Sequence, residues 1–372
     1  MKSKLKTMIY PFDVESAPLV RNNELIGKYN ITQAVSPNGW GFNEKDVGYV
    51  DGGQDVGITI DSNFDKALEN SDSVFFNQSS QKLDFNNVIY PKIIKAAKNS
   101  KSIICTIEIE EKLIDEISYI CHKNNKSFEY FSNKFDEIIT PPNEEILPIS
   151  VPVIFVSGVA ERTNKFEIQL NLRKYMKEMG YKISQIGTRH YCELMGFHSF
   201  PKFMYNKSIS ESEKVTLFNY YIKTISIMEN PDVIIIGIPG GSIPFNNKFT
   251  NKFGILSYEI SQAVKPDVSI LTIPYGNIPQ EYFETMSESY KYKFGYSIDC
   301  CNIANSSLNI AASQIASSLQ YITMDYNFIN EKKKIYLDSN MPIYNILDIH
   351  DAKNMCEFLI GKLQEYGKNN VV

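Results

Sequence analysis

The residues with the clearest chemical potential lie in one loop, between an apolar segment and a helix-forming one. They are Gly158, Glu161, Arg162, Thr163, Asn164 and Lys165. A strand that feeds a loop ending in a lysine at a helix N-terminus is the layout of a phosphate-binding loop. Backbone amides and the positive helix end attract the anion there, and the lysine adds a point charge. We therefore expect Lys165 to hold the phosphates of a nucleotide.

The loop departs from the usual pattern G-x-x-x-x-G-K-[ST] in three ways. The second glycine is missing, one extra residue separates Gly158 from Lys165, and Phe166 stands where a Mg²⁺-binding hydroxyl is expected. Thr163 is an alternative source of a hydroxyl. The other interpretation is an ordinary strand-to-helix connection with an exposed lysine.

A second cluster lies in the loop that follows the next expected strand. It contains Arg189, His190, Cys192, Glu193 and His198. In a nucleotide site, Arg189 or His190 would neutralise charge that develops during transfer, and Glu193 would hold Mg²⁺ or act as a base. A metal site of His190, Cys192 and His198 is a further alternative, although their spacing matches no familiar zinc pattern. The cluster can also be a solvated loop packed on its neighbours.

Three more candidates follow other apolar strands. Gly240 and Gly241 end the strand that begins at residue 232, and Asn277 lies in the turn after residues 268–273. Glycines allow a backbone to approach a ligand closely, or they only make a tight turn. Asn277 would read a nucleobase, although asparagine is also common in turns for its own reasons. No acidic residue ends the strand at 232–237, where P-loop folds place one beside the phosphate loop.

The elements that must position these residues alternate between strand and helix. Strands are expected at 151–156, 181–188, 232–238 and 268–273, and helices at 165–179, 211–229, 255–264 and 279–292. This alternation predicts a parallel sheet covered by helices on both faces. Ligands of such sheets bind outside the carboxyl ends of the strands, so the candidate loops should gather at one edge.

The N-terminal half is a second α/β region, which we predict to be Rossmann-like. Strands are expected at 8–10, 46–50, 73–77, 102–107 and 128–131, and helices at 64–70, 86–98 and 110–123. The half lacks G-x-G-x-x-G, so a dinucleotide cofactor is not indicated. The predicted fold class is α/β, with a Rossmann-like domain at 1–140, a proline-rich linker at 141–150 and a P-loop-like parallel-sheet domain at 151–372.

Composition narrows the possible functions. The chain has 372 residues, 43% hydrophobic and 22% charged, which is typical of a folded globular protein. A net charge of −5 gives no support to nucleic acid or an anionic membrane as a partner. No apolar run approaches 18 residues and no signal peptide is evident. Six cysteines without a C-x-x-C pair fit reduced thiols, so we expect a cytoplasmic protein.

The segment 158–170, with 184–187 and 196–201, resembles a clostridial family of peptide maturation system proteins. That family is associated with clusters encoding a radical-SAM maturase, a peptidase and an exporter. The resemblance implies a small peptide or its maturation enzymes as partners. The P-loop half is also distantly similar to the dethiobiotin synthetase and cobyrinic acid synthase class, which uses ATP and Mg²⁺ to activate a carboxyl or carbamate group. The missing glycine and Phe166 depart from that class.

Three functional hypotheses follow. The first is a protein of peptide maturation that binds ATP or GTP, with Mg²⁺ as a possible cofactor, and acts as an ATP-dependent ligase or kinase-like enzyme. The second is a non-catalytic scaffold, derived from a P-loop protein, that binds the precursor peptide or the maturase. The third is a metal-binding enzyme that uses His190, Cys192 and His198. The sequence leaves open whether the chain is an enzyme and whether it forms a homodimer.

Overall fold

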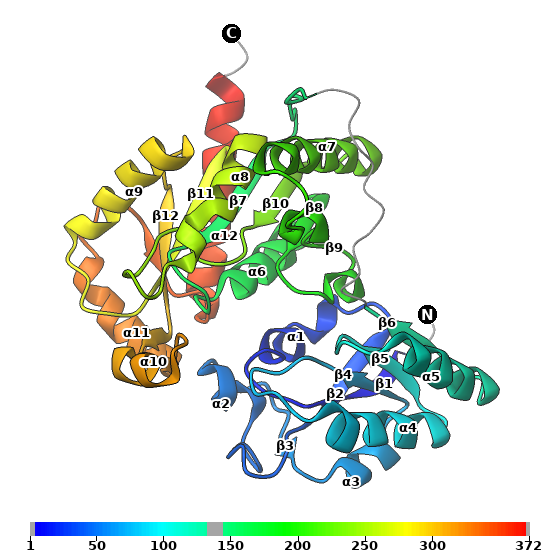
Figure 1. Ribbon diagram of the computed structural model, residues 1–372. Coiled ribbons are helices and arrows are strands. Elements are labelled where there is room, and N and C mark those ends of the chain that lie inside the picture. The colour runs from blue at the N-terminus through cyan, green and yellow to red at the C-terminus, as the bar shows by residue number, and fades with distance from the viewer. Residues whose placement is uncertain (1–3, 132–143, 370–372) are drawn as a thin grey trace. The chain divides into compact units, whose positions relative to one another are not determined.

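The computed structural model describes residues 4–131 and 144–369. The chain divides into two compact units, which are treated separately below (Figure 1). Unit 1 comprises Met1–Lys134 with Glu193–Gly196, and unit 2 comprises Phe135–Cys192 with Phe197–Val372. Part of the predicted linker, residues 141–143, lies outside the described residues. The rest of it, residues 144–150, forms neither helix nor strand.

Unit 1 is built on a parallel sheet. Its strands, within residues 4–131, are β1 (Leu5–Tyr10), β2 (Tyr29–Val35), β3 (Ile60–Asp61), β4 (Ser73–Phe76), β5 (Ser102–Cys105) and β6 (Phe128–Tyr130). Its α-helices there are α1 (Ala17–Arg21), α2 (Val47–Asp51), α3 (Phe64–Glu69), α4 (Tyr90–Lys98) and α5 (Glu111–Lys123). The strand order β3-β2-β1-β4-β5-β6 is that of a Rossmann fold, as the α/β alternation predicts.

The strand predicted at 46–50 is wrong. This segment forms α2, because the Asp46 side chain accepts a hydrogen bond from the Gly48 amide and caps the helix. The strand at this position in the sheet is β2, which the sequence analysis did not identify. Its polar residues Asn30, Thr32 and Gln33 dilute the apolar signal.

Unit 2 contains a larger parallel sheet with the order β15-β12-β11-β7-β10-β8-β9. Its strands are β7 (Val153–Gly158), β8 (Ile183–Gly187), β9 (His198–Ser199), β10 (Val233–Gly237), β11 (Val268–Pro274), β12 (Cys300–Ala304) and β15 (Ile343–Tyr344). A separate hairpin pairs β13 (Ser306–Leu308) with β14 (Tyr321–Thr323). The α-helices are α6 (Lys165–Glu178), α7 (Glu211–Glu229), α8 (Ile255–Ala263), α9 (Glu281–Phe294), α10 (Ile310–Ala316), α11 (Tyr326–Lys333) and α12 (Ile349–Asn369). The predicted elements of this half are confirmed up to α9.

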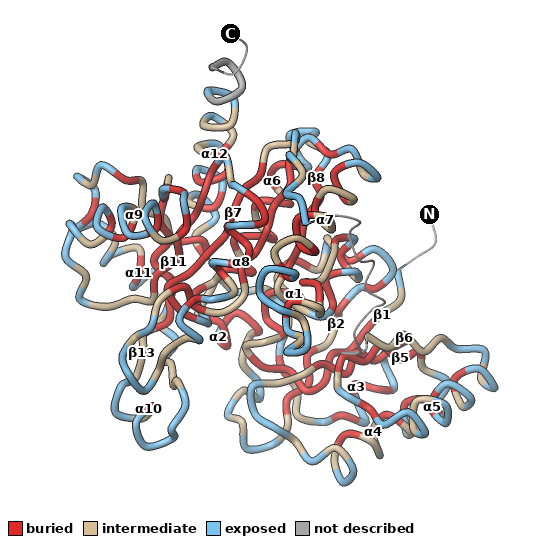
Figure 2. Tube along the Cα trace, turned by 45° about the horizontal axis from the view of Figure 1, so that its top comes forward, coloured by how far each residue is buried: buried red, intermediate tan, exposed pale blue. Residues whose placement is uncertain are grey.

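Helices cover both faces of this sheet. Buried side chains of α7, α8 and α9 pack on one face, and those of α6 and α12 pack on the other (Figure 1). The central strands β7, β10 and β11 are buried along nearly their whole length (Figure 2). Their apolar runs therefore lack polar alternation, because both faces of each strand are covered. The sheet order reverses around β7, so the loop after β7 lies where such sheets bind ligands.

Aspartates fix the strand register at the amino edges of both sheets. Asp267 directly precedes β11, and its carboxylate accepts a hydrogen bond of 2.8 Å from the Val153 amide at the start of β7. The Asp267 amide donates back to the Val153 carbonyl, also at 2.8 Å. Asp72, Asp232 and Asp299 make the same two-way contact before β4, β10 and β12. Each contact holds two neighbouring strands level at their first residues.

The six cysteines are separate thiols, and all are buried. In the part of the chain that the structure describes, no helix combines the length and the apolar character needed to cross a membrane.

Replacing the aspartate that aligns β7 with β11 should loosen that edge. We expect Asp267→Ala to lower the free energy of unfolding by about 1 kcal/mol, because the Val153 amide loses a charged acceptor. Asp267→Asn keeps an acceptor oxygen and should cost less. Urea unfolding measures both. Equal losses in the two variants would contradict a role for the acceptor oxygen.

Candidate functional site

The loop after β7 is held in place from three sides. The Val159 amide donates to the Thr272 carbonyl of β11 at 3.0 Å, and the Thr272 hydroxyl donates to the Thr163 carbonyl. The Ser242 amide, in the turn after β10, donates to the Gly158 carbonyl at 3.0 Å. These bonds join the carboxyl ends of three neighbouring strands, as the parallel sheet predicts.

Lys165 is the first residue of α6, and its side chain turns back into the loop. Its amine donates to the Ala160 carbonyl at 2.8 Å and to the Gly240 carbonyl. The residue is only 8% exposed. Burial lowers the pKa of Lys165 to about 8, against an ordinary value of 10.5; nearby Glu161 raises the pKa and Arg189 lowers it. The lysine is therefore buried, contrary to the exposed alternative.

Two residues of the loop adopt the left-handed backbone conformation. Arg162 has φ of +53° and Asn164 has φ of +59°. Asparagine tolerates this conformation better than most residues, so Asn164 can serve where the usual pattern has its second glycine. The Asn164 side-chain oxygen also accepts from the Asn305 amide at 3.2 Å. The missing glycine is thus compatible with a phosphate-loop backbone.

Several amides of the loop have no acceptor. Within the described residues, the backbone N–H groups of Ala160, Thr163 and Asn164 make no hydrogen bond. Ala160 is 0% and Thr163 is 1% exposed, so solvent does not replace the missing acceptor freely. Successive unpaired amides near left-handed residues form a concavity suited to an anion.

Glycines give the loop its close contacts. A Cβ on Gly158 would lie 2.7 Å from the Thr163 hydroxyl oxygen, and one on Gly241 would lie 2.7 Å from the Val159 carbonyl oxygen. Gly240 supplies a carbonyl to Lys165. Both predicted glycines of the turn after β10 therefore lie against the loop after β7.

Phe166 packs where the pattern has a hydroxyl residue. Its ring is 3% exposed and makes edge-on contacts with Tyr191, at 6.0 Å between centroids. The Arg189 guanidinium lies 5.7 Å from the Phe166 ring centroid and acts electrostatically on Lys165. The aromatic side chain therefore holds a second cation near the loop. The Thr163 hydroxyl lies in the same loop and donates to the Ala160 carbonyl at 3.2 Å.

The other predicted residues are exposed. His190 is exposed on the loop after β8, and Asn277 is exposed in the turn after β11. Glu161 is exposed beside Lys165, so its carboxylate would oppose an anion, and its backbone is the part suited to binding. Glu193 belongs to unit 1, so it is described apart from Lys165.

The residues of the metal hypothesis have other contacts. The Cys192 thiol donates to the Arg189 carbonyl at 3.1 Å, and His198 pairs with Glu229 of α7 at 2.5 Å. Burial raises the pKa of Glu229, but hydrogen bonds from Ser184 and His198 outweigh it and leave the pKa lowered. No group of three or more His, Cys, Asp or Glu side chains suited to a metal ion occurs in residues 4–131 and 144–369.

A buried polar stripe on α6 was not among the residues predicted from the sequence. Lys165, Gln169 and Arg173 are 8%, 0% and 3% exposed and recur every fourth residue, so they share one helix face. Their spacing between apolar neighbours is visible in the sequence and marks a face turned toward a polar site. Thr272 and Asn305 also make hydrogen bonds to the loop, but no pattern in the sequence predicts these bonds.

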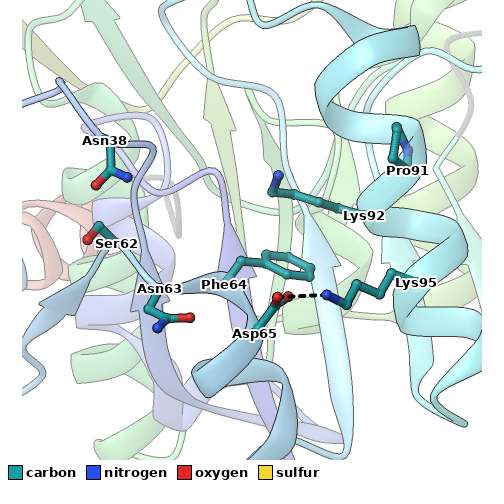
Figure 3. Close-up of a pocket in the computed structure, with 8 residues that line it drawn as sticks. All are labelled: Asn38, Ser62, Asn63, Phe64, Asp65, Pro91, Lys92 and Lys95. Carbon is teal, nitrogen blue, oxygen red and sulfur yellow. Dashed lines mark ion pairs between the residues drawn. The ribbon is translucent and has the colours of Figure 1, made fainter.

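Unit 1 offers a weaker candidate, a surface hollow of about 530 Å³ beside the N-terminus of α3. Its cations are engaged: Lys95 pairs with Asp65 at 2.7 Å, and the Lys92 amine lies 5.5 Å from the Phe64 ring centroid (Figure 3).

In the loop after β1, Asp13 is buried and accepts from the Ser80 amide at 2.6 Å. A carboxylate there opposes the pyrophosphate that Rossmann folds bind at this position.

Comparison with known proteins supports the fold. The chain is similar to a crystal structure of a DUF1611 family protein from Anabaena variabilis, with 10% sequence identity and a TM-score of 0.61. The likeness covers 96% of this chain and 100% of that chain. At this identity it shows the α/β fold alone. No family model and no curated protein matches the sequence.

Removing the buried charge should stabilise the protein. The difference between a pKa of 10.5 and one of about 8 corresponds to a penalty of roughly 3 kcal/mol for the charged amine in the folded chain. We expect Lys165→Met to raise the free energy of unfolding by up to this amount at pH 7.

The stability gained by Lys165→Met should shrink as pH rises. Between pH 8 and 10.5 the folded amine loses its proton before the unfolded one, so wild type becomes more stable relative to the variant as pH rises. Urea unfolding at pH 7, 8.5 and 10 should show the two proteins converging. A difference that stays constant over this range would contradict the pKa shift.

The left-handed conformation of Asn164 gives a separate prediction. Asn164→Gly should fold normally, whereas Asn164→Val should lose about 1–2 kcal/mol, because a branched side chain is strained at this φ. Asn171→Val, in the right-handed helix α6, is the matched control and should cost less. Thermal unfolding ranks the three variants, and equal losses for Asn164→Val and Asn171→Val would contradict the backbone argument.

Proposed function

We propose that unit 2 binds the phosphate groups of a nucleotide, ATP or GTP, in the loop 158–165. The observation that carries the proposal is a buried lysine amine beside buried amides that lack acceptors. Keeping a charged amine buried costs stability. A group retained at such a cost is more simply explained by a ligand than by structure. An anion in the loop would satisfy both the amine and the amides.

In the proposed complex, phosphate oxygens take over from the carbonyl partners of Lys165. The amides of Ala160, Thr163 and Asn164 donate to the phosphates, and the positive end of α6 adds to the attraction. Arg189, held against Phe166, neutralises charge at the same edge. Gly240 and Gly241 let the turn after β10 approach the ligand closely.

The residues of the loop do not fit a protein-held Mg²⁺ ion. Phe166 is apolar and buried where the pattern has a hydroxyl, and β10 ends at Gly237 without a carboxylate. We therefore derive no phosphoryl-transfer step. This favours the scaffold hypothesis, in which a bound nucleotide organises the protein without being consumed. An ATP-dependent ligase or kinase-like activity remains a proposal.

The role in peptide maturation rests on the resemblance of residues 158–170 to that family. We propose it as the context of nucleotide binding, with a small peptide or a maturation enzyme as the partner. A pull-down from purified components, with the precursor peptide immobilised and ATP present or absent, tests this partner separately from the nucleotide.

Calorimetric titration with ATP and GTP tests the proposed site. Wild type should bind at least one of them, and Lys165→Met should bind 10- to 100-fold more weakly, because a charge-assisted hydrogen bond contributes about 1.5–3 kcal/mol. Lys177→Met removes an exposed lysine from the last turn of the same helix and is the control. Unchanged affinity in folded Lys165→Met would contradict the assignment, and absence of binding by wild type would contradict the proposed function.

A further inference from the structure

Gln169, one turn after Lys165 on α6, has a fully buried side chain whose polar atoms are unused. It is 0% exposed, and neither its amide nitrogen nor its amide oxygen has a hydrogen-bond partner in the described residues. Leaving a buried amide without partners is costly, and native structures rarely do so without a bound water or ligand nearby. The side chain therefore marks a place where a further group belongs.

The Gln169 amide lies at the carboxyl end of β10. It lies so close to the Gly237 backbone that a Cβ on Gly237 would overlap the amide atoms. Gly237 is the last residue of β10, and the turn that follows provides the Gly240 carbonyl to Lys165. Since residues four apart lie on the same face of a helix, Gln169 follows Lys165 by one turn on that face of α6. A neutral amide from α6 thus fills the space that an acidic side chain at the end of β10 would occupy.

The charges around the loop have one consequence for the ligand. Lys165 and Arg189 bring positive charge, the exposed Glu161 brings one negative charge, and Gln169 brings none. Phe166 and Gly237 stand where P-loop proteins have a hydroxyl and a carboxylate that hold a divalent cation. Such a site attracts a phosphate most strongly when its negative charge is not already neutralised by a metal ion.

We propose that the loop binds its phosphate ligand in the metal-free form, with the Gln169 amide as a neutral hydrogen-bonding group at the base of the site. This inference rests on the proposed phosphate binding and specifies its ligand. The chemical class is a free diphosphate or triphosphate ester rather than its magnesium complex. Because its amide is neutral, Gln169 does not attract the divalent cation that a carboxylate at this position would bind.

Titration of the full chain with ATP, in EDTA and in excess MgCl₂, tests the inference. Pyrophosphate, which lacks a nucleobase, is titrated in the same way. Wild type should bind in EDTA, and Mg²⁺ should weaken binding severalfold. Gln169→Leu should bind about tenfold more weakly in EDTA without loss of thermal stability, because an unsatisfied amide is replaced by an apolar group of similar size. Gln185→Leu removes another fully buried glutamine, from the middle of β8, whose amide nitrogen donates to the Gln169 backbone carbonyl at 3.4 Å and whose amide oxygen also lacks a partner. This variant leaves the Gln169 side chain in place and should bind like wild type.

A second substitution tests the charge argument. Gln169→Glu should weaken binding more than tenfold in EDTA and recover in MgCl₂, because the new carboxylate repels free phosphate and attracts the cation. Thermal unfolding checks that each variant is folded.

The outcomes separate the two proposals. Binding by wild type that requires Mg²⁺ would overturn the inference and leave the proposed function standing. Unchanged affinity in folded Gln169→Leu would overturn the role of the amide. No binding of ATP, GTP or pyrophosphate under either condition would overturn the proposed function and the inference with it.

Discussion

The candidate site depends on the hydrogen bonds that the buried amine of Lys165 donates. It joins the loop after β7 to the turn after β10 through the Ala160 and Gly240 carbonyls. No carboxylate is hydrogen bonded to it in the part of the chain that the structure describes; its hydrogen bonds go to carbonyl dipoles, and Glu161 acts on its charge from a distance. The loop therefore combines close packing with an attraction for anions.

Much of unit 2 could be predicted because its strands are buried on both faces. Runs such as 153–156 and 233–236 have no polar alternation, and the loops between them follow from parallel connections. Unit 1 was harder. The mixed polarity of β2 hid a central strand, and a capping aspartate turned the apolar segment at 47–51 into a helix. Local hydrogen bonding overrode the pattern there.

The candidate site shows the same division. The alternation of strands and helices predicted that Lys165, Gly240 and Gly241 would lie at one edge of the sheet. They do, since the strands before them, β7 and β10, are parallel neighbours. It did not predict that Asn164 would adopt a glycine-like conformation or that Phe166 would hold Arg189. Those features depend on backbone angles and on side chains from another loop. Gln169 was visible as part of a four-residue repeat, but its meaning depends on Gly237, which is 68 positions away in the sequence.

The aspartates that align the strands lie at one end of the sheet of unit 2, and the candidate ligand-binding groups lie at the other end. Asp232, Asp267 and Asp299 level the strands at their amino ends, whereas the candidate ligand groups follow the carboxyl ends. Loops at the second edge can therefore change length or composition without shifting how the strands align. The loop between Gly158 and Lys165, one residue longer than the usual phosphate-loop pattern, lies at this edge. A scaffold with this separation can acquire new ligand preferences by loop exchange while its core stays the same.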